Sequence, residues 1–265
     1  MFDFHIHTSY SDDCSVEMES YIAPAISKGL KGICFTDHID IDYPNNTSKF
    51  LFEYPQYLND LNSLKDKYKG KLDIFLGIEF GMQPHLLETD SSFFAEKSFD
   101  YILGSIHSTN KKELYGEDYL KGITEHEGII SYFNDMLYCV KNFKSYNNLG
   151  HLDAINRYVI KGSNVYNAAK YMDYIEAILK AVIEAGKGIE LNTSGKRYGL
   201  PSFHPESSII KLYKKLGGEI ITLGSDSHNN HTLAYSFVEA MEVLASCGFK
   251  YYTIYKNGKP EFIKL

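Results

Sequence analysis

Histidines and carboxylates recur along the chain in short motifs that could bind divalent metal ions. The first motif is "FHIHTSYSDD", in which His5 and His7 stand two residues apart and Asp12 and Asp13 follow. Because side chains at i and i+2 of a β-strand point to the same side, His5 and His7 can bind one ion together if this segment is extended. An isolated pair of this kind is a weak signal, so the prediction depends on what the rest of the chain supplies.

Similar side chains follow other apolar runs. They are Asp37 and His38 in "FTDH", Glu79 in "GIEF", His107 in "GSIH", His151 and Asp153 in "GHLD", and Asp226 and His228 in "GSDSH". Taken singly, each has an ordinary interpretation as an ion-paired carboxylate or a hydrogen-bonded interior histidine. Together they exceed the needs of one ion, and burying them unpaired would be costly. Imidazole and carboxylate groups bind Zn²⁺, Mn²⁺ and Fe²⁺. We therefore predict a multinuclear metal site in which Glu79 bridges two ions and a third ion lies nearby.

The elements that must position these residues alternate along the sequence. We expect β-strands at 2–6, 32–37, 72–80, 100–107, 148–153, 188–193 and 219–226, and helices at 17–28, 54–68, 117–143, 168–185, 205–216 and 231–246. Strands that alternate with helices form a parallel sheet, and this many units favour a closed α/β barrel. Catalytic groups of such barrels lie at the C-terminal ends of the strands, where these motifs fall. No GxGxxG follows a predicted strand, which argues against a dinucleotide site.

The composition narrows the possible partners and location. With 265 residues, 44% hydrophobic and 23% charged, the chain can bury a large core, and we expect residues 1–265 to form one domain. The net charge of −7 and the lack of a basic stripe argue against nucleic acid. No apolar run approaches the roughly 20 residues of a membrane span, and the N-terminus does not resemble a signal peptide. We therefore expect a cytoplasmic protein with no membrane partner, whose four scattered cysteines are buried thiols.

In their order along the chain, "FHIHTSYSD", "FTDH", "GIEF", "GSIH", "GHLD" and "GSDSH" resemble the motifs of the polymerase-and-histidinol-phosphatase (PHP) family. The matches run from residue 2 to residue 228 and are jointly specific. "GHLDAINRY" and "ELNTSGKRYG" are similar to the monofunctional phosphatases of histidine biosynthesis within that family. The resemblance implies an α/β fold, a distorted (β/α)7 TIM-like barrel. It also implies three divalent ions (Zn, Mn or Fe) and hydrolysis of the small-molecule ester L-histidinol phosphate.

The resemblance also implies which residues bind each ion. His5, His7, Glu79 and Asp226 would hold the first, Glu79, His107 and His151 the second, and His38, His228 and an aspartate of "SDD" the third. In some relatives the last position is a histidine, and in others it is the aspartate of "SDG", which aligns with Asp12. We therefore prefer Asp12, with Asp13 as the alternative. Asp37 would orient a ligand histidine.

The predicted mechanism is attack of a metal-bridging hydroxide on phosphorus. Glu79, Asp226 and His228 are the predicted catalytic residues, the last two as candidates for protonating the leaving alcohol. The only arginines are Arg157 and Arg197, and both follow strands on the same rim. Because a guanidinium grips phosphate bidentately and lysine does not, we predict that both contact the substrate phosphate.

The alcohol part of the substrate needs acceptors for an ammonium and an imidazole. The loop 108–118 supplies three candidates, Glu113, Glu117 and Asp118, although a solvated charged loop is the simpler interpretation. Of the remaining histidines, His85, His126 and His204 are expected at the surface, and His231 at the N-terminus of a helix.

Two other functions stay open. One is a family phosphoesterase for another small ester, such as a nucleotide, a sugar phosphate or a phosphopeptide. The other is a non-catalytic or polymerase-associated module, which predicts missing ligand residues, whereas every ligand position here is filled. We expect a monomer or a homodimer.

Overall fold

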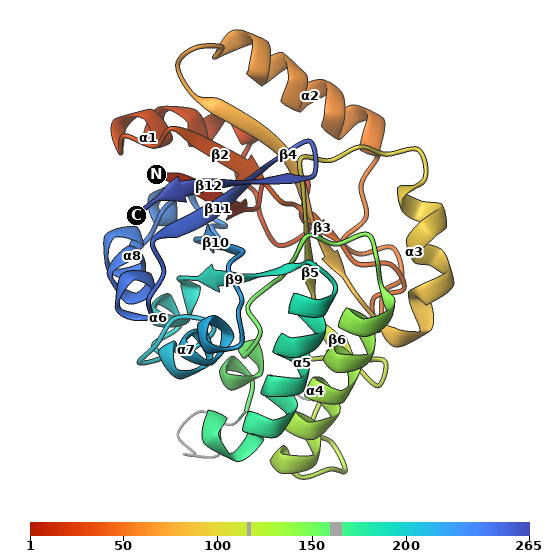
Figure 1. Cartoon of the computed structure of the whole chain (residues 1–265). Coiled ribbons are helices and arrows are strands. Elements are labelled where there is room, and N and C mark those ends of the chain that lie inside the picture. The colour runs from red at the N-terminus through yellow and green to blue at the C-terminus, as the bar shows by residue number, and fades with distance from the viewer. Residues whose placement is uncertain (116–117, 160–165) are drawn as a thin grey trace.

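The computed structural model describes residues 1–115, 118–159 and 166–265. Strands in these ranges form a curved parallel sheet (Figure 1). Its order is β1 (Phe2–Ile6), β2 (Gly32–Phe35), β4 (Asp73–Gly81), β5 (Tyr101–Ser105), β8 (Asn148–Leu149), β9 (Gly188–Asn192) and β10 (Ile221–Gly224). A parallel bridge between Ile6 and Ser227 brings the two edges of the sheet together. The described strands thus form a nearly closed barrel of seven strands, and the predicted fold is confirmed.

The barrel departs from regularity where the site lies. The pairing register between β1 and β2 shifts between Asp3 and Ile6, within the segment that carries His5. A short strand, β3 (His38–Ile39), continues beyond β2 and pairs with β4, so that His38 stands opposite Glu79. A small hairpin, β6 (Ser108–Thr109) and β7 (Lys112–Glu113), follows β5. These irregular segments lie at the carboxyl ends of the strands and bring polar side chains to that end.

Helices connect the strands and cover the outside of the barrel (Figure 1). They are α1 (Ile22–Ser27), α2 (Tyr54–Lys67), α3 (Leu87–Phe94), α4 (Glu125–Asn142), α5 (Met172–Glu184), α6 (Ser194–Arg197), α7 (Ser207–Lys215) and α8 (Phe237–Ser246). Helix α5 buries Ile175, Ile178 and Val182, as its apolar spacing requires. The helix predicted over 117–143 begins only at Glu125. There Thr124 and Glu127 cap each other's backbone N–H groups, which fixes the start.

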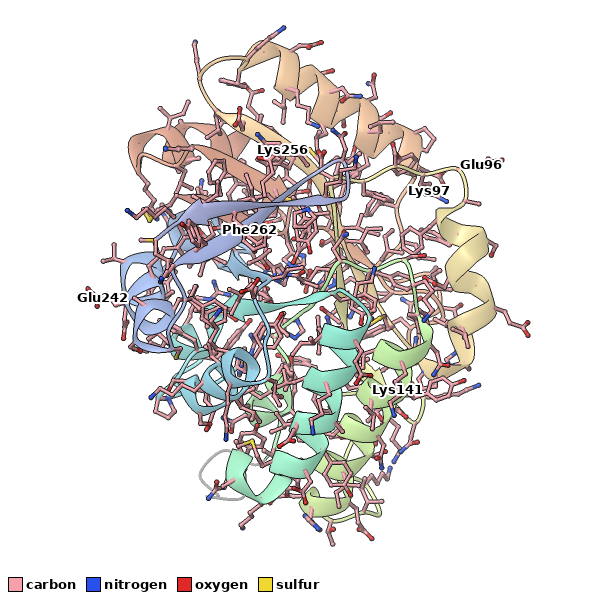
Figure 2. The ribbon with its side chains drawn as sticks, viewed as in Figure 1. Glu96, Lys97, Lys141, Glu242, Lys256 and Phe262 are labelled. Atoms are coloured by element: carbon pink, nitrogen blue, oxygen red, sulfur yellow. The ribbon has the colours of Figure 1, made fainter. Side chains whose placement is uncertain are left out.

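An antiparallel hairpin at the C-terminal end of the chain, β11 (Tyr251–Lys256) and β12 (Lys259–Lys264), was not predicted. It crosses the barrel at the end where the strands begin: Ile221 N–H donates to the Thr253 hydroxyl, and the Tyr255 hydroxyl donates to Asn148 Oδ1 at 2.9 Å. Figure 2 shows Lys256 and Phe262 on this hairpin, and Phe262 is half exposed. The hairpin therefore covers the amino ends of the strands, away from the predicted site.

In the described parts of the chain, no helix combines the length and the apolarity needed to cross a membrane.

Candidate metal centre

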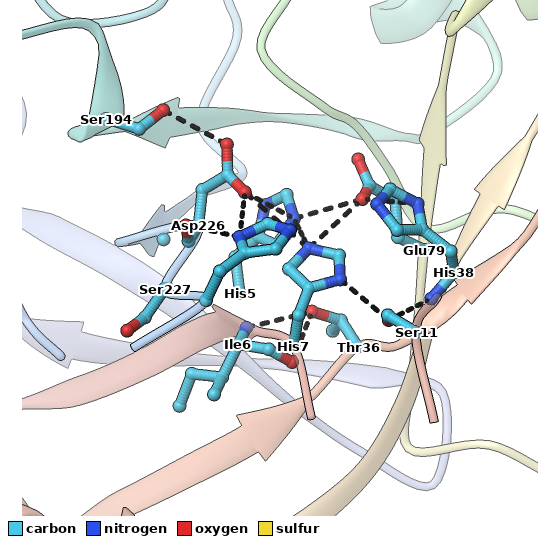
Figure 3. A network of polar contacts seen from close by, with 12 residues as sticks. His5, Ile6, His7, Ser11, Thr36, His38, Glu79, Ser194, Asp226 and Ser227 are labelled. Atoms are coloured by element: carbon cyan, nitrogen blue, oxygen red, sulfur yellow. Dashed lines mark hydrogen bonds and ion pairs between the residues drawn. The ribbon is translucent and has the colours of Figure 1, made fainter. Parts of the chain in front are cut away.

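The predicted histidines and carboxylates meet at the carboxyl ends of the strands (Figure 3). His5 lies on β1, His7 follows it and Glu79 lies on β4. The Nε2 atoms of His5 and His7 are 3.0 Å apart and lie 3.2 and 3.3 Å from Glu79 Oε2. Asp226 Oδ1 lies 3.6 Å from His7 Nε2 and 3.8 Å from His5 Nε2. These four side chains, predicted to hold the first ion, therefore converge with their donor atoms facing one another.

The two carboxylate oxygens of Glu79 face different imidazoles. Its Oε1 lies 3.1 Å from His107 Nε2 and 2.8 Å from His151 Nε2. Its Oε2 faces His5 and His7, and also lies 3.2 Å from His38 Nδ1. This arrangement is the one that a carboxylate shared between two metal positions requires.

A third group of donors includes Asp13 rather than Asp12. Asp13 Oδ2 lies 3.2 Å from His228 Nε2 and 3.6 Å from His38 Nε2. The Asp12 carboxylate instead accepts the backbone N–H of Phe50 at 2.8 Å. The structure therefore differs from the sequence-based preference for Asp12. The two side chains lie in a turn after β1, where neighbouring residues point in different directions.

The electrostatics of the cluster depend on burial and on the neighbouring charges. Burial alone would raise the pKa of Glu79, but the imidazoles of His5, His107 and His38 hold that pKa well below its usual range. Burial opposes a charge on His5, but Glu190, Glu79 and Asp226 raise its pKa well above the ordinary value. The buried Glu79 and Asp226 carboxylates are thus ionised, and their negative charge must be balanced by cations, either protons on the imidazoles or metal ions.

The residues fit divalent metal ions on two counts. Imidazole nitrogens and ionised carboxylates are the donors that Zn²⁺, Mn²⁺ and Fe²⁺ accept. In addition, His151 Nδ1 is a buried atom with no hydrogen-bond partner among the described residues, and His38 Nδ1 and Asp40 Oδ2 lie 3.3 Å apart without forming a well-aligned hydrogen bond. Buried polar atoms are normally satisfied, so the cluster has capacity for bound ions.

Two buried carboxylates that sequence analysis did not single out orient the histidines. Glu190 Oε1 lies 2.6 Å from His5 Nδ1, and Asp40 Oδ1 lies 2.8 Å from His107 Nδ1. When each Nδ1–H donates to its carboxylate, the Nε2 lone pair is directed toward Glu79. An acidic residue inside the apolar strand "GIELN" was the available signal for Glu190.

Asp37 supports His7 indirectly, in line with its predicted role. The Asp37 carboxylate accepts the Thr8 N–H at 2.6 Å and the Ser11 hydroxyl at 2.8 Å. Ser11 Oγ in turn lies 3.1 Å from His7 Nδ1 (Figure 3). Because the Ser11 hydroxyl donates its proton to Asp37, it accepts from His7 Nδ1–H and leaves Nε2 free to bind a metal.

The two arginines have different surroundings. The side chain of Arg157 is 9% exposed, its Nη2 lies 3.3 Å from Asp226 Oδ2, and its guanidinium lies over the Tyr198 ring. Arg197 instead donates to the carbonyl oxygens of Ser225 at 3.2 Å and of Asp226 at 2.6 Å. Asp226 has a φ of 53°, which is uncommon outside glycine, so Arg197 holds an unusual backbone turn.

A cavity of about 450 Å³ opens beside the cluster. Its lining includes Glu79, Asp226, His228 and Arg157 but not Arg197, and on other sides Tyr43, Lys49, Glu113 and Tyr158. Of the loop candidates for the alcohol part of the substrate, Glu113 lines this cavity, Asp118 is exposed, and Glu117 lies outside the described residues.

The other predicted surface histidines fall into two groups. His85 and His126 are exposed, as expected. The expectation for His204 is wrong: its side chain is 1% exposed and hydrogen-bonds to Asp153.

Comparison with known proteins decides the family. The PHP domain model matches residues 3–194. The chain belongs to the PHP family. This PHP protein is 34% identical over 254 residues to a probable histidinol-phosphatase of Clostridium acetobutylicum, covering 94% of this chain and 95% of that one. It is 32% identical to a histidinol-phosphatase of Lactococcus lactis, covering 93% of this chain and 91% of the relative.

A solved structure is similar to this PHP protein over nearly the whole chain. The crystal structure of histidinol phosphate phosphatase from Lactococcus lactis, complexed with zinc, L-histidinol and phosphate, has a TM-score of 0.89 and 29% identity to this PHP protein. The similarity covers 98% of both chains.

Proposed function

We propose that this PHP protein is a phosphomonoesterase that hydrolyses L-histidinol phosphate to L-histidinol and inorganic phosphate. The observation that carries the proposal is one cavity that presents both a cluster of metal-type donors and the guanidinium of Arg157. Relatives named for this activity match more than nine-tenths of the chain, and the Lactococcus structure holds histidinol and phosphate. The fold, the site and the comparisons support one reaction class.

We propose three ion positions. The first is formed by His5, His7, Glu79 and Asp226, the second by Glu79, His107 and His151, and the third by Asp13, His38 and His228. Zinc is the ion in the Lactococcus structure, and the same donors accept Mn²⁺ or Fe²⁺. When bound, such ions activate water at neutral pH and neutralise phosphate charge.

The residues of the chain divide the remaining work. Burial opposes the charge of Arg157, but Asp226 raises its pKa further above its usual range, so the guanidinium stays positive and binds phosphate oxygens. Burial alone would raise the pKa of Asp226, but His5 and Arg157 hold that pKa well below its usual range. Asp226 therefore stays ionised and is a poor proton donor. His228 is 26% exposed and lies on the cavity wall, so it is the better candidate to protonate the leaving alcohol, a role it can take only when it is released from the third ion position.

Recognition of the alcohol part is proposed for Glu113. Histidinol carries an ammonium group, and a carboxylate is its natural acceptor. Glu113 lies on β7 and lines the cavity together with Tyr43. Single-domain organisation of residues 1–265, a monomeric or homodimeric state and a cytoplasmic location remain predictions.

The test is a panel of phosphate esters assayed with the metal-loaded protein. We expect kcat/KM for L-histidinol phosphate to exceed that for nucleotides, sugar phosphates and phosphopeptides by at least about tenfold. Chelation should abolish turnover of every ester. Glu113→Gln should reduce the preference while activity on a simple aryl phosphate stays unchanged. Equal or better turnover of another ester would instead support the broader phosphoesterase alternative.

A further inference from the structure

A chain of hydrogen-bonded side chains leads from the buried Asp153 and His204 to Arg157 at the cavity. Asp153 Oδ1 lies 2.6 Å from His204 Nδ1, and Arg157 Nε lies 2.9 Å from His204 Nε2. Asp153 is fully buried and His204 is 1% exposed. His204 does not line the cavity, whereas Arg157 does, so His204 contacts the cavity only through the arginine.

The direction of each hydrogen bond follows from the chemistry of the groups. A guanidinium has N–H donors and no acceptor, so Arg157 Nε–H must donate to His204 Nε2. His204 must then carry its proton on Nδ1, and that N–H donates to the Asp153 carboxylate. Burial and the nearby positive charge of Arg157 lower the pKa of His204, which keeps the imidazole neutral. One tautomer of one neutral histidine therefore satisfies both partners.

We infer that His204 is a positioning residue that fixes the guanidinium of Arg157 for phosphate binding. With Nε held by His204, the plane of the guanidinium is set, and Nη2 contacts Ser194 and Asp226 at the cavity. Rotation of the arginine away from the cavity would break these contacts.

The rest of the fold holds His204 firmly enough for this role. Its backbone pairs with Asn192 at the end of β9 in both directions, at 2.9 and 2.7 Å. The other oxygen of Asp153 accepts the Glu206 N–H at 3.0 Å. A Cβ atom added to Gly195 would lie 3.2 Å from the His204 ring, so the ring is closely packed on that side. Arg157 is thus tied to the barrel through a rigid, buried acceptor.

This inference rests on the proposed function, since phosphate is the proposed partner of Arg157. The experiment therefore measures binding of inorganic phosphate to the metal-loaded protein by calorimetry, together with its metal content, and needs no turnover. His204→Asn removes the acceptor at the Nε2 position, whereas His204→Gln places an amide oxygen near it. We expect His204→Asn to weaken phosphate binding about tenfold, the order expected for one hydrogen bond to a charged group. His204→Gln should recover most of that loss, and metal content should not change.

The background variant Arg157→Ala makes the test specific. There, His204→Asn should cause no further loss of phosphate affinity. An equal loss in both backgrounds, no loss in either, a loss that His204→Gln does not recover, or a loss of metal would each overturn the inference. If the protein binds phosphate in this way but does not hydrolyse histidinol phosphate, the proposed function fails and the inference stands.

A second measurement uses the unmutated side chain and so does not depend on folding of the His204 variants. ¹⁵N NMR of His204 at neutral pH should show a neutral ring protonated at Nδ1, and Arg157→Ala should shift the Nε2 signal. An imidazolium, or a ring protonated at Nε2, would overturn the inference.

Discussion

Replacing Asp13 with asparagine should disable one metal position, whereas the same change at the neighbouring Asp12 should not. Asp13 Oδ2 lies 3.2 Å from His228 Nε2 and 3.6 Å from His38 Nε2, close enough for all three donors to share one ion. Asp12 accepts the Phe50 N–H instead. The two substitutions are chemically identical and one residue apart, so each is the control for the other.

The expected magnitudes differ widely. A neutral amide is a much weaker metal ligand than a carboxylate. Loss of a residue that only hydrogen-bonds to a metal ligand costs about 10–100-fold in metal affinity. Loss of the Asp13 carboxylate, itself a ligand, should therefore cost at least about 100-fold in metal affinity at that position. This corresponds to about 2.7 kcal/mol. Asp12→Asn weakens one hydrogen bond to a backbone N–H, which should lower the free energy of unfolding by about 1 kcal/mol and leave metal affinity unchanged.

The assay is metal content by elemental analysis after equilibration at graded free Zn²⁺ or Mn²⁺, with kcat measured on the same samples. Asp13→Asn should lose one ion per chain at metal concentrations where Asp12→Asn and the unmutated protein stay fully loaded. Loss of metal from Asp12→Asn with full loading of Asp13→Asn would refute the assignment.

Three further predictions concern the support of the cluster. Glu190→Gln should weaken metal affinity about 10–100-fold by loosening His5, measured by competition with a chelator; unchanged affinity would contradict the role of Glu190. Opposing carboxylates raise the pKa of His38 to about 10 despite its burial, so metal binding must displace a proton there throughout the pH range below about 10. Metal affinity should therefore rise with pH across that range. Calorimetry in buffers of different ionisation enthalpy at pH 7.5 should detect proton release, and absence of release would contradict the displacement of a proton from His38. Arg197→Ala frees the backbone turn at Asp226 and should lower metal content, whereas retained metal with weaker phosphate binding would return Arg197 to a phosphate-contact role.

The arrangement of the barrel was predictable because its strands are short β-branched and aromatic runs between helical segments. The carboxyl ends of parallel strands meet at one end of a barrel, so His5, Glu79 and His107 could be placed together from sequence alone. The sequence did not decide between Asp12 and Asp13, because that choice depends on the direction of side chains in an irregular turn.

The remaining differences have similar causes. His204 carries no periodic signal, and its partners Asp153 and Arg157 are distant in sequence, so only the fold reveals its burial. The phosphate-binding role of the arginines was predicted from their rarity and from their positions after strands, and neither says whether a guanidinium faces a cavity or a carbonyl. The hairpin at the end of the chain was overlooked although Asn257 and Gly258, both with positive φ, form the Asn-Gly pair typical of tight hairpin turns.

The central claim is that the histidines and carboxylates at the carboxyl ends of the strands hold metal ions next to an arginine that binds phosphate. A crystal structure of the metal-loaded protein with inorganic phosphate, recorded at the absorption edge of the metal, tests it most directly. We predict anomalous peaks on both sides of the Glu79 carboxylate and a third beside Asp13, with phosphate within hydrogen-bond distance of Arg157. Absence of anomalous signal among these residues, or phosphate bound away from Arg157, would contradict the account.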